Sequence, residues 1–120
     1  MMSECGGEEL EKIKKMAHAP YSGHRVGACL ITQDGKEYFG FNIENASYSL
    51  TICAERVAFV HALLNGERNF KRIYVTDFPC GACLQFMAEF VQDDFEIVVV
   101  KDGEEKRFKF RELYPHPFRL

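Results

Sequence analysis

The chain has 120 residues, enough for one domain with a single hydrophobic core and too few for two. Apolar residues make up 47% of it and charged residues 28%, which are ordinary fractions for a soluble globular protein. The net charge is −3 and no cluster of Lys and Arg is interleaved with aromatic residues, which argues against nucleic-acid binding because phosphates require a basic face. A small neutral substrate fits this balance better, and we expect no nucleic-acid partner.

The sequence contains no segment suited to export or to a bilayer. Residues 1–15 lack the apolar stretch of a signal peptide. The longest apolar run, residues 57–64, is interrupted by His61 and is far shorter than the roughly 20 residues of a membrane-spanning helix. Five cysteines, an odd number, then indicate a reducing compartment. We expect a cytoplasmic protein without a membrane partner, whose cysteines are explained by packing, redox chemistry or metal.

Periodicity and turn residues predict the elements in chain order. They are a helix over 8–17 ended by Ala19-Pro20, strands over 26–32 and 36–42 around the Asp34-Gly35 turn, a loop over 42–51, a helix over 54–64, a strand over 72–76, a helix from Pro79 to about Val91, strands over 96–101 and 106–110, and an irregular tail. We expect a single domain over residues 1–120, in which residues 1–7 form a flexible leader.

This order of elements predicts an α/β fold, a mixed five-stranded sheet with helices on its faces. The first two strands should pair antiparallel through their tight turn. The helical crossovers should make the middle strands parallel, with right-handed connections.

One pattern of cysteines carries chemistry. Cys53-Ala54-Glu55 and Pro79-Cys80-Gly81-Ala82-Cys83 both lie at predicted helix starts. Helix N-termini lower thiol pKa values, so we expect these sulfurs to be poised as thiolates. Three thiolates from two helix ends can occupy three corners of a tetrahedron around zinc. The fourth corner then stays open for water, as in catalytic zinc sites.

Glu55 supplies the acid–base group that such a site requires. Bound zinc lowers the pKa of its water from roughly 15.7 to about 7, and a nearby carboxylate can take that proton and return it to a substrate. Residues at i and i+2 do not share a face in mid-helix. At the first turn, however, both Cys53 and Glu55 can reach towards the open end of the helix.

Each part of the pattern has a simpler interpretation. Cys53 alone would be a packed core thiol, the C-x-x-C pair alone a redox motif, and Glu55 alone a solvated helix residue. A fourth thiolate from Cys5 or Cys29 would make a structural zinc site. The combination of C-x-E with P-C-x-x-C is the signature of zinc deaminases. We therefore favour the catalytic zinc site, then the structural one, and place the redox pair last.

Four segments resemble a known family. They are APYSGHRVGA (19–28), GFNIENASYSLTICAERVA (40–58), PCGACLQ (79–85) and ELYPHPF (112–118). Together they make the chain similar, over nearly its whole length, to the small homotetrameric zinc-dependent cytidine deaminases. The resemblance implies a three-layer α/β/α fold, one Zn²⁺ per subunit, active sites shared between subunits of a homotetramer, and a nucleoside substrate. The implied reaction is hydrolytic deamination of cytidine or 2′-deoxycytidine to the uridine compound plus ammonia, in pyrimidine salvage.

The resemblance also implies roles for single residues. Cys53, Cys80 and Cys83 would bind zinc. Glu55 would relay a proton to the ring nitrogen of the pyrimidine and then to the departing amine, and Arg56 would hydrogen-bond the zinc thiolates. The positions implied to bind substrate are Asn42 and Glu44 at the ribose hydroxyls, His24 beside the pyrimidine, Ala54 and, reaching the site of a neighbouring subunit, Ala46, Tyr48 and Phe118.

The chain departs from the family pattern at several positions. His24 replaces a Phe that stacks near the pyrimidine, and Leu84 replaces a cation near the zinc helix. Asp77-Phe78 is a very short link between strand and helix, where the family carries a longer loop. Tyr114 replaces a Leu, and Cys29 falls where Ala is common and is expected to be a core residue. None of these changes involves the zinc ligands or Glu55.

Three alternatives to cytidine deamination are left open. The nearest is a related deaminase of another aminopyrimidine nucleoside, such as blasticidin S, although the NIENASY block favours an ordinary nucleoside. A non-catalytic zinc-stabilised module is the second. Editing of RNA or DNA is the third, and the acidic balance of charge opposes it.

Overall fold

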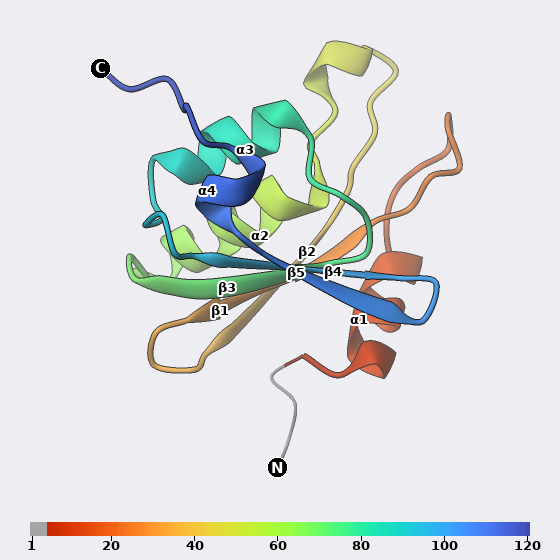
Figure 1. The fold of residues 1–120 in the computed structure, drawn as a ribbon. Helices are drawn as coiled ribbons and strands as arrows, with labels where there is room; N and C mark the ends of the chain where they lie inside the picture. Colours follow the sequence, from red (N-terminus) through yellow and green to blue (C-terminus); the bar gives the residue numbers. More distant parts are fainter. Residues whose placement is uncertain (1–4) are drawn as a thin grey trace.

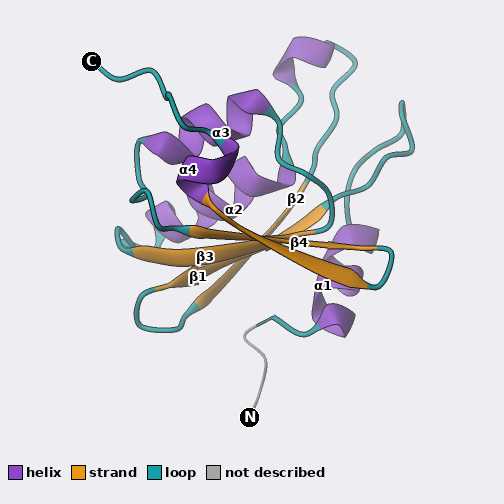
Figure 2. Ribbon diagram, in the orientation of Figure 1, coloured by secondary structure: helices purple, strands orange, loops and turns teal. Residues whose placement is uncertain are grey.

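The fold, given by a computed structural model that describes residues 5–120, has one sheet between two layers of helices. In chain order the elements are α1 (Gly7–Lys15), β1 (Gly27–Thr32), β2 (Glu37–Phe41), the 3₁₀ helix η1 (Tyr48–Leu50), α2 (Ala54–Leu64), β3 (Phe70–Val75), α3 (Gly81–Ala88), β4 (Glu96–Lys101), β5 (Glu104–Lys109) and α4 (Phe110–Leu113). Helix α1 covers one face of the sheet, and α2, α3 and α4 lie over the other (Figures 1 and 2). The predicted α/β fold with five strands and helices on both faces is confirmed.

The strands lie in the order β2-β1-β3-β4-β5. As predicted, β1 and β2 pair antiparallel, and the crossover through α3 makes β3 and β4 parallel. The prediction that the middle strands are all parallel is wrong for β1 and β3, which pair antiparallel. The reason is that the crossover through α2 does not return the chain to the strand it left. It leaves β2, passes β1 and adds β3 at the other edge of β1, so β3 runs in the direction of β2 and opposite to β1.

Several element boundaries differ from the prediction. Helix α3 begins at Gly81 rather than at Pro79, because Cys80 has an extended backbone (φ −80°, ψ 169°) and is the N-cap. The tail that was predicted to be irregular contains α4. This short helix forms because Phe110 is buried and the Glu112 carboxylate accepts a hydrogen bond from the Lys109 backbone N–H at 2.7 Å.

Alternation along the strands divides the core in two. Ala28 and Leu30 of β1 face α2 and α3, whereas Cys29 and Ile31 face α1. The larger core is rich in Phe, as the composition predicts. The Phe59 ring is fully buried and lies against the rings of Phe70, Phe86, Phe90 and Phe95, with centroids 5.1–6.2 Å away.

The N-terminal end of the described chain is tied to the sheet. Cys5 is bonded to Cys29 in a disulfide across 24 residues, and both are buried. Cys29 is therefore a core residue, as expected. Its bond to Cys5 was not predicted from the sequence. A disulfide is also not what we expect in a reducing compartment. Residues 5–7 consequently differ from the predicted leader, whereas residues 1–4 of that leader lie outside the described residues.

Candidate metal centre and substrate site

Three cysteines meet where the N-termini of α2 and α3 lie together. Cys53 is the N-cap of α2 and Cys80 that of α3, while Cys83 lies in the first turn of α3. The Cys53 and Cys80 sulfurs are 3.9 Å apart, and those of Cys80 and Cys83 are 3.6 Å apart. The structure therefore brings together the three residues that the sequence pattern selected.

The spacing of the sulfurs fits zinc. Tetrahedral zinc with Zn–S bonds of about 2.3 Å separates neighbouring sulfurs by about 3.8 Å, close to both observed distances. Cys83 is buried and Cys80 is exposed, so the cluster opens to one side. Such a set can hold zinc and leave a position for water.

The metal-free cluster holds its charge unevenly. Hydrogen bonding from Cys83, together with Arg56 and Cys80, lowers the pKa of the Cys53 thiol to about 5 against the effect of burial. The hydrogen bond to Cys53, with burial and the Glu55 charge, raises the pKa of Cys83. In the metal-free cluster the Cys83 thiol therefore holds its proton more tightly than an ordinary thiol. Loss of this proton is coupled to metal binding.

Glu55 lies at this cluster, in the first turn of α2. Its side chain is buried, with a relative exposure of 4% for the residue. Burial, with the neighbouring Cys53 charge, raises the pKa of its carboxyl to about 7, although Cys83 and Arg56 act in the other direction. A carboxyl whose pKa is close to neutral can both accept and donate a proton during one reaction.

Arg56 borders the cluster as the resemblance implies. Its Nη2 is 4.0 Å from the Cys53 sulfur and donates to the Thr51 carbonyl at 3.2 Å. Burial opposes its charge, but the hydrogen bond to Cys53 and the nearby sulfurs outweigh this and raise the pKa of the guanidinium. Its Nε is buried without a hydrogen-bond partner among residues 5–120. The contact of the guanidinium with the Cys53 sulfur accounts for its buried position.

Asn42 and Glu44 hold the loop that carries His24. The buried Asn42 amide accepts from the Val26 N–H at 2.8 Å and donates to the His24 carbonyl at 2.9 Å. The Glu44 carboxylate accepts from the Tyr21 N–H at 2.9 Å and from both the N–H and the hydroxyl of Ser22. These bonds lower the pKa of Glu44. Both side chains therefore stabilise the loop before β1, a role that was not predicted from the sequence.

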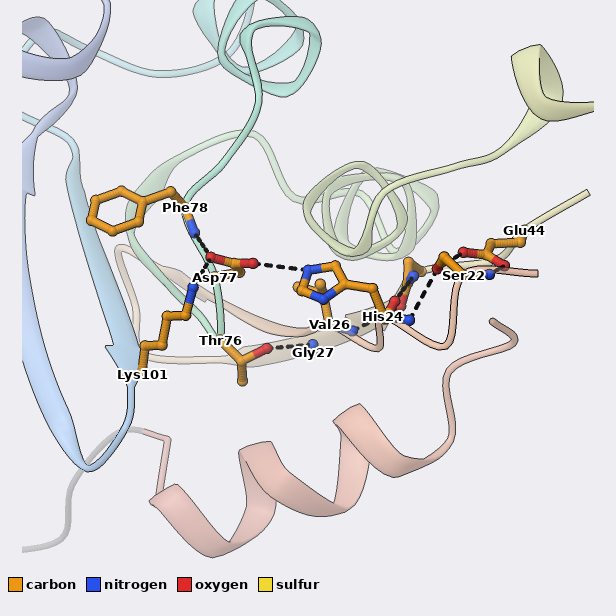
Figure 3. Close-up of polar contacts among 10 residues, drawn as sticks. Ser22, His24, Val26, Gly27, Glu44, Thr76, Asp77, Phe78 and Lys101 are labelled. Carbon is orange, nitrogen blue, oxygen red and sulfur yellow. Dashed lines mark hydrogen bonds and ion pairs between the residues drawn. The ribbon is translucent and has the colours of Figure 1, made fainter. Parts of the chain in front are cut away.

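The His24 side chain is directed at Asp77, which lies in the short link between β3 and α3. Its Nε2 lies 2.8 Å from the Asp77 carboxylate, whose other oxygen lies 2.9 Å from Lys101 Nζ. Figure 3 shows this row of side chains, with the Phe78 ring pointing away from it. A weak sequence signal existed, because Asp77 lies two residues after the buried end of β3, at the edge of the sheet where α3 begins.

The residues implied to serve a neighbouring subunit are exposed in this chain. Ala46 is exposed, and the side chains of Tyr48 and Phe118 have exposures of 74% and 69%. The Phe118 backbone is pinned to α3, because Gln85 donates to its carbonyl and accepts from its N–H, both at 2.9 Å. Ala54, in contrast, is fully buried, directly beside Cys53.

Two hollows are relevant to the position of the substrate. One of about 330 Å³ is lined by Tyr21, Ser22, Glu44, Tyr48 and Thr51, on the side where the ribose is expected. The larger hollow, of about 640 Å³, lies at the far end of α3 and includes none of the predicted site residues. Neither hollow is lined by the three cysteines or by Glu55, and the second is not assigned to the substrate.

The geometry excludes Cys5 and Cys29 as a fourth zinc ligand. They belong to the core that faces α1, on the opposite side of the sheet from Cys53, Cys80 and Cys83. Their sulfurs lie close to a carboxylate oxygen of Glu37, but the disulfide already uses both. The alternative of a structural four-thiolate site built with these cysteines is therefore wrong.

The fold and the cluster define a zinc-binding α/β protein with an acid–base carboxyl beside the metal. The family model described as "Cytidine and deoxycytidylate deaminase zinc-binding region" matches residues 7–100. The chain belongs to this family of zinc-dependent hydrolytic deaminases.

Individual relatives agree with this assignment. A probable cytidine deaminase of Dictyostelium discoideum is 48% identical over 108 residues, covering 78% of this chain and 72% of the relative. The cytidine deaminase of Sporosarcina psychrophila is 39% identical over 117 residues, covering 92% of this chain and 86% of the relative. The crystal structure of cytidine deaminase from Burkholderia pseudomallei is similar with a TM-score of 0.87 and 40% identity, covering 92% of this chain and 94% of that one.

Proposed function

We propose that this protein hydrolyses cytidine and 2′-deoxycytidine to uridine and 2′-deoxyuridine with release of ammonia. The observation that carries the proposal is the Cys53, Cys80 and Cys83 cluster with the buried Glu55 carboxyl against it. The choice of cytidine as the substrate is based on the relatives named cytidine deaminase, which are up to 48% identical to this chain.

Zinc held by the three cysteines supplies a Lewis acid that makes water nucleophilic near neutral pH. Glu55 takes a proton from the attacking water and gives it to the ring nitrogen of the pyrimidine. As the bond from the ring carbon to the amine breaks, Glu55 carries a second water proton to the departing nitrogen. The oxygen of water remains on the ring, and ammonia leaves. Its pKa of about 7 suits both transfers.

The remaining residues position the substrate and balance charge. Arg56 offsets the negative charge of three thiolates on one divalent ion. Asn42 and Glu44 border the ribose side directly or through the loop that they hold, and His24 forms the wall beside the pyrimidine. Ala54, which is buried at the start of α2, contributes to substrate binding.

We further propose a homotetramer with shared active sites, in which Ala46, Tyr48 and Phe118 complete the site of a neighbour. Their exposure supports this, because large apolar side chains that are 74% (Tyr48) and 69% (Phe118) exposed are available for contact with a neighbouring subunit. The whole chain would form one domain of each subunit.

The place of the enzyme is proposed to be pyrimidine salvage in the cytoplasm. None of the helices within residues 5–120 has the length and apolar character to cross a membrane. The free thiols of Cys53, Cys80 and Cys83 favour this compartment, whereas the disulfide between Cys5 and Cys29 does not.

The test is conversion of cytidine by zinc-loaded protein, followed by ultraviolet absorption with parallel measurement of ammonia. We expect Glu55→Ala to keep zinc and fold but to lose nearly all turnover, by a factor of about 10⁴ for the loss of acid–base catalysis. Full activity of the zinc-loaded variant would contradict the mechanism. No conversion by wild-type protein with one zinc per chain would reject cytidine as substrate, and blasticidin S would be assayed next.

A further inference from the structure

The connection between β3 and α3 places a carboxylate against the ring that is expected to face the substrate. Asp77 lies three residues before Cys80, and its Oδ2 is 2.8 Å from the Nε2 of His24 (Figure 3). The link between the end of β3 and the start of α3 is only five residues long (76–80), so the carboxylate cannot move far from the end of the strand.

Asp77 is itself held from two further sides. Its Oδ1 accepts a hydrogen bond from the Phe78 N–H at 2.8 Å and one from Lys101 Nζ on β4 at 2.9 Å. Although burial opposes its charge, these donors lower the pKa of Asp77. The Phe78 ring packs against Phe108, with centroids 5.8 Å apart, and so anchors the link. Asp77 is therefore a fixed acceptor.

The His24 ring, in contrast, has little else to hold it. Its side chain is 62% exposed, and it follows Gly23, which has a positive φ of 72°. The backbone of His24 is fixed, because its N–H donates to the Ser22 hydroxyl and its carbonyl accepts from Asn42, both at 2.9 Å. Rotation of the ring about its own side-chain bonds is then restricted by Asp77.

We infer that Asp77 is a positioning residue of the substrate site, which orients the His24 ring for contact with the pyrimidine. The inference rests on the proposed function, which puts His24 beside the base. A Phe at position 24 has no polar atom for a carboxylate to hold, so the dependence on Asp77 belongs to the histidine of this chain. Holding the ring removes the entropy cost of ordering it when substrate binds.

The kinetic test is a double-mutant cycle on zinc-loaded protein with cytidine. We expect Asp77→Ala to raise KM about fivefold with kcat nearly unchanged, since ordering one side chain is worth about twofold to tenfold in affinity. Asp77→Asn, which keeps a hydrogen-bonding group of the same shape, should fall between. In a His24→Phe background, Asp77→Ala should change KM by less than about 1.5-fold, because the partner is gone. Asp102→Asn, which removes a carboxylate beside Lys101, is the matched control and should leave KM unchanged.

Other outcomes overturn the inference. An undiminished effect of Asp77→Ala in the His24→Phe background, or an unchanged KM in the single variant, refutes action through His24. Loss of zinc or of kcat with KM unchanged assigns Asp77 to holding the zinc loop instead.

A crystal structure of zinc-loaded Asp77→Ala separates this inference from the proposed function. We expect the His24 ring to leave its position or lose order. A ring that stays in place refutes the inference whatever the substrate is, whereas failure of the wild-type protein to convert cytidine refutes only the proposed function.

Discussion

Replacing Gly40 by Ala should damage both the stability and the metal site, because α2 crosses β2 at this residue. A Cβ on Gly40 would lie 2.4 Å from the Ala54 carbonyl oxygen and 2.4 Å from the Ala58 nitrogen. Both are backbone atoms of α2, and neither can rotate away. Since nonbonded contacts are comfortable from about 3.4 Å, the helix must withdraw by about 1 Å.

The energetic cost follows from this contact. Overpacking a rigid core costs about 1–3 kcal/mol, and backbone contacts place this substitution at the upper end. For 120 residues the entropy of unfolding is about 0.25 kcal/mol/K, so a loss of about 3 kcal/mol lowers Tm by about 12 °C. The shift also moves Cys53 and Glu55, which begin the same helix. Because metal–ligand distances tolerate only about 0.2 Å, zinc affinity falls, and kcat should fall about 100-fold.

Thermal unfolding and zinc content of the purified variants measure both effects. Gly7→Ala is the control, because a Cβ there meets nothing within 4 Å. It should keep its zinc and lie within about 2 °C of the wild-type Tm. A Gly40→Ala protein with full zinc and a Tm within about 3 °C of wild type would refute the reasoning.

Three other predictions use separate features. Cys5→Ser removes a bond that spans 24 residues, so the loop-entropy model predicts a loss of about 3.5 kcal/mol in urea denaturation with zinc binding intact; equal stability of oxidised wild type and variant would contradict it. In metal-free protein, the folded state keeps the Glu55 proton between pH 4.5 and about 7, whereas the unfolded state has released it. The free energy of unfolding therefore falls by about 3 kcal/mol as pH rises through this window. Unfolding at pH 5 and pH 8 should reveal this fall in wild type relative to Glu55→Gln, and a pH-independent difference between them would refute it. Phe59→Ala should cost about 3–5 kcal/mol in the same urea assay, because it empties the centre of the larger core; a loss below about 1 kcal/mol would mean that the neighbouring rings collapse into the space.

Local patterns were predicted well from the sequence. The bounds of α2 and β4 agree with the prediction, because helical and β-branched periodicity are visible within each segment. The metal cluster was predicted for the same reason. Its residues lie at two helix starts with short spacings, so the pattern needs little knowledge of the fold.

Features that depend on distant partners were not predicted. The position of β3 beside β1 is decided by where the sheet has a free edge, and no residue of β3 encodes it locally. Cys5 and Cys29 meet only because α1 lies across the sheet. Asp77 contacts His24 and Lys101, which are 53 and 24 residues away, so its position after a buried strand gives only a weak local signal.

The placement of the five cysteines on two sides of the sheet has a consequence for how the chain reaches its native state. In the folded protein, the strand layer separates the disulfide from the zinc cluster, so thiol–disulfide exchange between them is blocked. In the unfolded chain the same five sulfurs can meet freely, and most of the possible pairings are wrong. Zinc present during refolding should occupy Cys53, Cys80 and Cys83 early and leave Cys5 and Cys29 as the remaining pair. The metal that serves the reaction would thereby also direct correct oxidation of the chain.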